Sequence, residues 1–197
     1  MKNISRFLYW SFTGFLLFVG FLSAFAYAQM TDEMMQAMQV SMTPGEHHEK
    51  LKPMTGTFQV ESTMWMDSSS SPVTGTGISE NRWVLGNRFL EQRLTGSFMD
   101  MPFEAIGYMG YENIQKKYVS SWMDSMGTGI MPAEGVLKPD NSIEFLAQYP
   151  DAISGKMMKF KEILRIHSQD HYSLEMYITG EDGSEFKNME AHYRRQK

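Results

Sequence analysis

The sequence predicts a mainly β protein, a closed antiparallel up-and-down β-barrel of about ten strands with one or two short helices before it. Two observations predict this fold. From Thr55 to the end, stretches with alternating apolar and polar residues follow one another at short, fairly even intervals, without a helical run between them. The links are short and rich in turn residues, which makes successive strands antiparallel neighbours. An open sheet of this size would leave two exposed edges, and closure removes them. A two-layer sandwich is the alternative.

The N-terminal residues have the layout of a secretory signal peptide. Lys2 and Arg6 precede the uncharged run "FLYWSFTGFLLFVGFLSAF", which ends in the small-x-small pattern Ala-Tyr-Ala. We therefore expect residues 1–28 to be a signal peptide cleaved after Ala28, and the mature chain to be periplasmic or secreted. A retained membrane anchor is the alternative, because the run is long enough to span a bilayer.

Charge and cysteine content exclude several classes. The net charge is −5, and no basic cluster precedes the C-terminal "RRQK", which argues against nucleic acid as a partner. The chain has no cysteine, so it contains no disulfide, thiolate nucleophile or cysteine zinc site. The apolar core alone must hold the fold together.

The segment 29–54 is predicted to be helical, before a barrel domain spanning 55–197. Thr31 or Asp32 can cap a first helix. Pro44 starts a second short helix after the break, and Pro53 ends it. Methionines recur every four residues in the first helix and share one face: Met30, Met34, Met38 and Met42.

The predicted strands are Gly56–Met66, Gly75–Val84, Arg88–Ser97, Phe103–Tyr111, Lys117–Asp124, Gly127–Leu137, Ser142–Gln148, Met157–His167, Tyr172–Thr179 and Glu185–Arg194. Alternation is clear in the strand that begins at Ser142, where Ile143, Phe145 and Ala147 share a face. In the following strand, Glu162 interrupts an otherwise apolar face.

Several motifs resemble those of the bacterial domain-of-unknown-function family 1579, from about Pro44 to Lys197. They are "HEKLKPMTGTF", "RWVLGNRFLEQ", "GYMGYENIQKKYVSSWMDSMGTGIM", "EGVL" and "LEMYITGEDGSEFKNMEAHYRR". The resemblance implies a lipocalin-like (calycin) β-barrel and no assigned activity. The family usually has Gly-x-Trp at the first strand, where this chain has Phe58. Phe58 can still fill the plug site, but without an N–H donor.

Small closed barrels often enclose one ligand, and this chain is rich in aromatic residues. We therefore predict an interior that binds a small, mostly apolar molecule, with an apolar lining and two polar contacts. The alternative is a barrel filled by its own rings, with a structural or interaction role. An error of one residue in the assumed position of a strand would exchange its predicted inward and outward faces. The predicted lining is Trp65, Trp83, Phe89, Phe103, Tyr118, Trp122 and Tyr177, with Arg93 and Asp124 as the polar contacts.

Each polar contact has an alternative. Asp124 could orient a ligand or pair with an arginine, or it could cap the turn that follows its strand. Glu91 and Arg93 could form an inward pair for a polar head group, or lie on a solvated outer face. The arginines considered as partners of Asp124 are Arg82, Arg88 and Arg93.

No cofactor is predicted, although two cofactor hypotheses remain open. The chain has 19 methionines, and the stripe of Met30, Met34, Met38 and Met42 with His47 and His48 could bind copper, but a methionine stripe is usually a packing face. His192 could ligate haem, but nothing around it specifies this. Because hydrolase elbows, phosphate loops and HExxH are absent, an enzyme is the less favoured interpretation.

Overall fold

The computed structural model describes residues 31–67, 69, 71–152, 154–180 and 182–197. They fall into two units, one ending at Met42 and the other beginning at Thr43. The expected signal peptide, residues 1–28, lies outside the described residues. Within the described part of the chain, no helix is both long and apolar enough to cross a membrane.

The first unit contains helix α2 (Asp32–Met42). The backbone N–H of Met34 donates a hydrogen bond to Thr31 Oγ1 at 3.2 Å, so Thr31 acts as a cap. The helix buries none of its residues, and the expected stripe of Met34, Met38 and Met42 is about half exposed.

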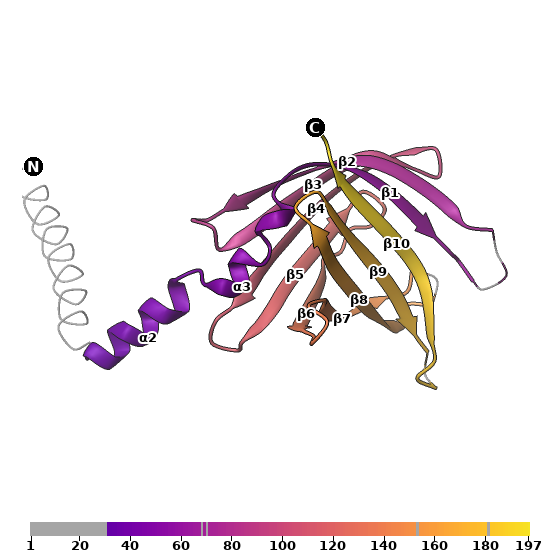
Figure 1. Cartoon of the computed structure of the whole chain (residues 1–197). Helices are drawn as coiled ribbons and strands as arrows, with labels where there is room; N and C mark the ends of the chain where they lie inside the picture. The colour runs from indigo at the N-terminus through magenta and orange to yellow at the C-terminus, as the bar shows by residue number, and fades with distance from the viewer. Residues whose placement is uncertain (1–30, 68, 70, 153, 181) are drawn as a thin grey trace, which may run out of the picture. The chain divides into compact units, whose positions relative to one another are not determined.

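The second unit is a closed barrel of ten antiparallel strands, as predicted (Figure 1). Each strand pairs with its neighbours in sequence, and β1 pairs with β10 to close the barrel, which excludes a two-layer sandwich. The strands are β1 (Gly56–Met64), β2 (Val73–Val84), β3 (Phe89–Phe98), β4 (Met101–Glu112), β5 (Lys117–Asp124), β6 (Met131–Leu137), β7 (Ile143–Pro150), β8 (Met157–Ser168), β9 (His171–Thr179) and β10 (Glu185–Arg195).

All but one of the predicted strands match the observed bounds to within two residues. The exception was expected to begin at Gly127, whereas β6 begins at Met131. The intervening residues form an exposed loop instead of strand. Gly129 in this loop approaches Tyr149 so closely that a Cβ would lie 2.2 Å from the Tyr149 hydroxyl oxygen. The glycine therefore serves a close approach between loop and wall.

A short segment before β1 plugs one end of the barrel. It contains α3 (Glu46–Glu49) and the 3₁₀ turn η1 (Lys52–Met54). Leu51 and Met54 are almost completely buried and belong to the core cluster of the barrel. Pro53 was expected to end the second helix but lies inside η1, in the first turn, where its missing N–H is tolerated.

Phe58 occupies the plug site, as the family resemblance implied. Its side chain is fully buried, and its ring meets the Tyr172 ring edge-on at a centroid distance of 5.0 Å. The guanidinium carbon of Arg195 lies 4.6 Å from the Phe58 ring centroid. A cation–π contact from Arg195 thus covers the ring.

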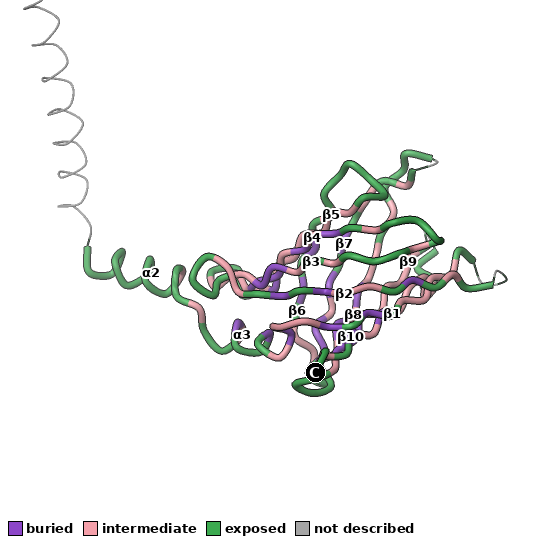
Figure 2. Tube along the Cα trace, turned by 90° about the horizontal axis from the view of Figure 1, so that it is seen from above, coloured by how far each residue is buried: buried purple, intermediate pink, exposed green. Residues whose placement is uncertain are grey.

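Figure 2 shows buried, half-buried and exposed residues along the strands, and in β7 the buried positions alternate with the others. In β7 the predicted inward set of Ile143, Phe145 and Ala147 is buried. The buried cluster joins Leu51 and Met54 of the plug to inward residues of the strands. Its members are Leu51, Met54, Phe58, Val60, Leu90, Met109, Tyr118, Ala133, Ile143, Phe145, Ala147, Leu164, Tyr172, Ala191 and Tyr193.

Candidate functional site

The barrel contains a cavity of about 470 Å³ beyond the packed core. All ten strands contribute to its wall, and Met54 of η1 reaches it from the plug. Small-molecule sites typically measure roughly 300–1,000 Å³ and are mostly apolar. The apolar part of this wall is dominated by methionine and aromatic residues, among them Met64, Phe98, Phe103, Met109, Trp122, Met131, Met176 and Met189.

The strand register explains which side chains face the cavity. Residues directly opposite each other on paired strands share a face. Phe103 lies two residues from Ala105 in β4, and Trp122 lies two residues from Ser120 in β5. Because Ala105 and Ser120 pair with inward residues of the neighbouring strands, Phe103 and Trp122 also lie on the inward face. The inward face is set by the buried residues of each strand, such as Tyr118 in β5.

Asp124 lies at the end of β5, beside the mouth of the cavity. Its Oδ2 accepts a hydrogen bond from Trp122 Nε1 at 2.9 Å, and its Oδ1 accepts one from the backbone N–H of Met126 at 2.9 Å. Asp124 therefore orients the Trp122 indole and caps the turn after β5, which was the alternative interpretation of the sequence. The arginines considered as its partners bind elsewhere: Arg82 and Arg93 bind Glu91, and Arg88 binds the carbonyl groups of Leu85 and Gly86.

Glu162 is the unusual member of the wall. It is only 8 % exposed, and β8 places it between Phe145 of β7 and Met176 of β9. Among the described residues, none forms a hydrogen bond or ion pair with its carboxylate. Burial raises the pKa of Glu162 to about 7. Burial, helped by the nearby Glu162 charge, also raises the pKa of Tyr193 to about 12. The break in the apolar face of β8 was visible in the sequence, but Glu162 was not predicted as a site residue.

Tyr172 connects the cavity wall to the plug. Its hydroxyl oxygen accepts hydrogen bonds from Asn81 Nδ2 at 2.9 Å and from Gln92 Nε2 at 3.2 Å. Asn81 Nδ2 also donates to the carbonyl oxygen of Met54 at 2.8 Å, and Asn81 Oδ1 accepts from Ser79 Oγ at 2.7 Å. These buried polar groups satisfy one another, and together they fasten η1 to the inner wall.

The predicted lining residues divide into three groups. Phe103, Trp122 and Asp124 line the cavity. Trp83 and Tyr118 face inward, but they belong to the packed end near the plug, where Tyr118 is fully buried. The remaining four face outward: Trp65, Phe89, Arg93 and Tyr177.

For these four residues the prediction of an inward side chain was wrong, because the residues next to them in the chain face inward instead. Trp65 follows the inward Met64, and Lys187 Nζ lies 5.6 Å from its ring centroid. Lys161 Nζ lies 4.7 Å from the ring centroid of Tyr177. Phe89 alternates with the buried Leu90 and therefore faces outward. Outward rings are sheltered here by long charged side chains, so ring size alone does not identify the inner face.

Arg93 takes part in a network on the outer face, centred on Glu91. Glu91 accepts hydrogen bonds from Arg93 Nε at 2.9 Å, from Arg82 Nε at 3.0 Å and from the Tyr108 hydroxyl at 2.9 Å. These bonds, led by that from Arg93, hold the pKa of Glu91 at about 2 even though its burial opposes this. The hypothesis of an inward Glu91–Arg93 pair is therefore wrong, and the outer-face alternative is correct.

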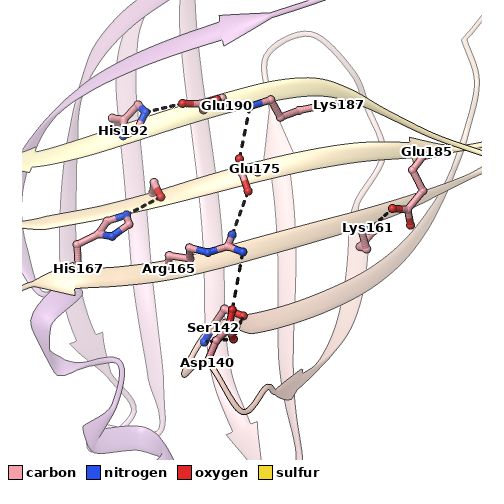
Figure 3. A network of polar contacts seen from close by, with 11 residues as sticks. Asp140, Ser142, Lys161, Arg165, His167, Glu175, Glu185, Lys187, Glu190 and His192 are labelled. Atoms are coloured by element: carbon pink, nitrogen blue, oxygen red, sulfur yellow. Dashed lines mark hydrogen bonds and ion pairs between the residues drawn. The ribbon is translucent and has the colours of Figure 1, made fainter.

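A second outer-face network crosses β8, β9 and β10 (Figure 3). Arg165 Nη1 and Lys187 Nζ both contact the Glu175 carboxylate, at 3.0 and 3.4 Å. Lys187 Nζ also contacts Glu190, which accepts a hydrogen bond from His192 Nε2 at 2.7 Å. His192 thus belongs to the outer surface and does not point into the barrel as an axial haem ligand would.

The two histidines of the copper hypothesis have partners within the second unit. Within the described residues, no group of three or more His, Asp or Glu side chains could hold a metal ion. His48 is buried and its Nδ1 accepts a hydrogen bond from the N–H of Gly45 at 3.1 Å, while His47 stacks on Tyr111 at a centroid distance of 4.0 Å. Both histidines therefore pack within the plug.

The comparison with solved structures finds several similar chains. The protein Rv2717c from M. tuberculosis is 16 % identical with a TM-score of 0.55, and the match covers 79 % of this chain and 100 % of that one. A de novo designed fluorescence-activating β-barrel is 17 % identical with a TM-score of 0.38, over 72 % of this chain and 93 % of that one. The barrel EF1p2_mFAP2b bound to DFHBI is 13 % identical with a TM-score of 0.39, over 77 % and 100 %.

Comparison with curated proteins gives no match. A family model does match, under the description "Protein of unknown function (DUF1579)", over residues 43–195. The match spans the plug and all ten strands, in agreement with the resemblance read from the motifs. The chain therefore belongs to the DUF1579 family.

Proposed function

We propose that this protein is an exported barrel that binds one small, mostly apolar molecule in its interior. The cavity is the observation that carries the proposal. It measures about 470 Å³, is walled mainly by apolar side chains and is closed at one end by the plug. A site of this volume and composition suits a small organic ligand.

The arrangement of the core favours binding over a purely structural role. A barrel that served only as a scaffold would have no reason to leave this space, since interiors normally pack to high density. Here the buried cluster fills the plug end, and the wall continues beyond it with half-buried apolar residues such as Phe103, Leu174 and Met189. The orienting bond from Trp122 to Asp124 also fixes one aromatic ring at the mouth.

Export is supported by the pattern of residues 1–28 in the sequence. N-terminal analysis of the protein isolated from its own cells tests this part separately. We expect the mature chain to begin at Gln29. A chain that keeps residues 1–28 and stays in the membrane fraction would contradict cleavage and favour the anchor.

Native mass spectrometry of the protein isolated from its own cells tests ligand binding. We expect an added mass of small-molecule size that is lost on denaturation. Its identification would define the ligand class. A protein that carries no such mass, and that also fails to bind any apolar probe after purification, would contradict the proposal and favour the scaffold role.

A further inference from the structure

Glu162 is a carboxylate inside an otherwise apolar part of the cavity wall. Its neighbours across the strands are Phe145 and Met176, and the inward residues on either side of it in β8 are Phe160 and Leu164. None of these side chains can donate a hydrogen bond, and the nearby Tyr193 hydroxyl, whose pKa the Glu162 charge helps to raise, forms no hydrogen bond with the carboxyl. No described residue pairs with this carboxyl, and its oxygens are open to the cavity instead of sealed in the wall, so a group inside the cavity can reach them.

The charged side chains of the cavity wall are all acidic. Its described residues include two carboxylates, Asp124 and Glu162, and none is a lysine, arginine or histidine. The two oxygens of Asp124 are already bonded to Trp122 and to the backbone of Met126. Glu162 is therefore the carboxylate of this wall that no described residue binds, while an anionic ligand would meet no cation in the wall.

Resting on the proposed function, we propose that the cavity takes an amphiphile with an apolar body and a positively charged amine, and that the amine pairs with Glu162. Methionine and aromatic side chains would surround the apolar body. The ammonium would donate to the carboxylate, and each charge would offset the cost of burying the other. The pKa of Glu162, raised by burial, is consistent with a carboxyl that has no cation among its protein neighbours and would become fully ionised beside an ammonium group.

Aromatic residues add to the preference for a cation. Trp122 and Phe103 line the same cavity, and their ring faces attract positive charge. A fatty acid of the same length would place its carboxylate against this acidic wall. Cationic amphiphiles should therefore bind more tightly than anionic ones, a difference that an apolar cavity alone would not produce.

Calorimetric titration with decylamine, decanol and decanoate tests the proposal, at mildly alkaline pH, with the two ionic compounds below their critical micelle concentrations and decanol below its solubility limit. The three share one chain and differ in the head group, and both Glu162 and the fatty acid are then ionised. We expect decylamine to bind about tenfold or more tightly than decanol, and decanoate to bind weakest. Decanoate binding as tightly as decylamine would overturn the inference. Failure of all three to bind would instead contradict the proposed function itself.

Glu162→Gln keeps the shape of the side chain and removes its charge. We expect this variant to lose the preference for decylamine over decanol, while decanol binds within about threefold of its original affinity. Glu61→Gln is the matched control, because Glu61 lies on the outer face of β1 with 64 % of its side chain exposed. An unchanged preference in Glu162→Gln would refute the assignment of the amine to Glu162.

Discussion

Arg195, at the end of the last strand, covers the ring of Phe58 in the first strand, with 4.6 Å between the guanidinium carbon and the ring centroid. The same guanidinium donates hydrogen bonds to the carbonyl oxygens of Thr55 at 2.7 Å and of Pro53 at 2.9 Å. It also donates to the carbonyl oxygen of Gln169, in the turn before β9. One side chain therefore ties the plug to the strand pair that closes the barrel.

Replacing Arg195 should weaken the closed end of the barrel. Arg195→Gln removes several charge-assisted hydrogen bonds to carbonyl groups of the plug and of the turn before β9, so we expect a loss of about 2 kcal/mol or more in the free energy of unfolding. Urea denaturation measures this. Arg194→Gln is the control, since Arg194 forms an exposed ion pair with Glu61 worth less than about 1 kcal/mol. Equal losses in the two variants would show that Arg195 does not fasten the plug.

Gly56 makes the approach of Arg195 possible. Its φ is +116°, and a Cβ there would lie 2.3 Å from Arg195 Nη1. Gly56→Ala should therefore lower the free energy of unfolding by about 1 to 3 kcal/mol, through backbone strain and displacement of the guanidinium. Gly183→Ala separates the two causes, because Gly183 also has a positive φ but open space around its Cβ position. We expect the thermal midpoint to fall further for Gly56→Ala.

Glu162 should make stability fall as the pH rises. In the unfolded chain the carboxyl ionises near pH 4.5, whereas in the folded protein its pKa is about 7. Between these values the folded state holds a proton that the unfolded state lacks, so the free energy of unfolding decreases through this window, by on the order of 1 kcal/mol per pH unit. Above about pH 7 the loss is complete.

The variant Glu162→Gln isolates this effect. His48 and His171 have pKa values lowered chiefly by burial and produce the opposite slope below their unfolded value of 6.5, but they are present in both proteins. We therefore expect the urea midpoint of the variant, relative to that of the original protein, to be higher at about pH 8 than at about pH 5. A constant difference between the two proteins would mean that Glu162 has an ordinary pKa.

Glu91 should have the opposite influence, at lower pH. Its pKa falls from 4.5 to about 2 on folding, chiefly through the hydrogen bond from Arg93. The stabilisation is thus present above about pH 4.5 and is lost as the pH falls toward 2. Denaturation curves of Glu91→Gln should show reduced stability at neutral pH and a smaller difference near the acid end of this window. A difference that does not depend on pH would contradict the network as described.

The strand pattern could be predicted from the sequence because alternation and turn residues are local signals, and closure could be inferred because an open sheet of this size would leave two exposed edges. The family motifs agreed with them. The inner face was harder, since Trp65 and Tyr177 lie outside under Lys187 and Lys161. Their rings are sheltered by charged side chains, which sequence alternation does not reveal.

The most informative site residue was visible in the sequence but was treated as an exception. Glu162 interrupts a run of apolar residues on one face of β8. Only the packing of β7 and β9 beside it shows that the carboxyl is enclosed among apolar neighbours. Asp124 was the better candidate from the sequence because it lies next to Trp122, yet the fold uses it to cap a turn. Long-range pairing therefore decides between the two acids.

The most direct test of a ligand-binding interior is a fluorescence titration with the apolar probe phenylnaphthylamine on two neighbouring variants. Ser62 faces inward and lines the cavity, between the small residues Gly75 and Ala191, whereas Thr63 faces outward. Ser62→Phe should fill the cavity and reduce probe affinity about tenfold or more, and Thr63→Phe should leave it nearly unchanged. Equal binding by both variants and the original protein would show that the probe binds elsewhere and would contradict a ligand site inside the barrel.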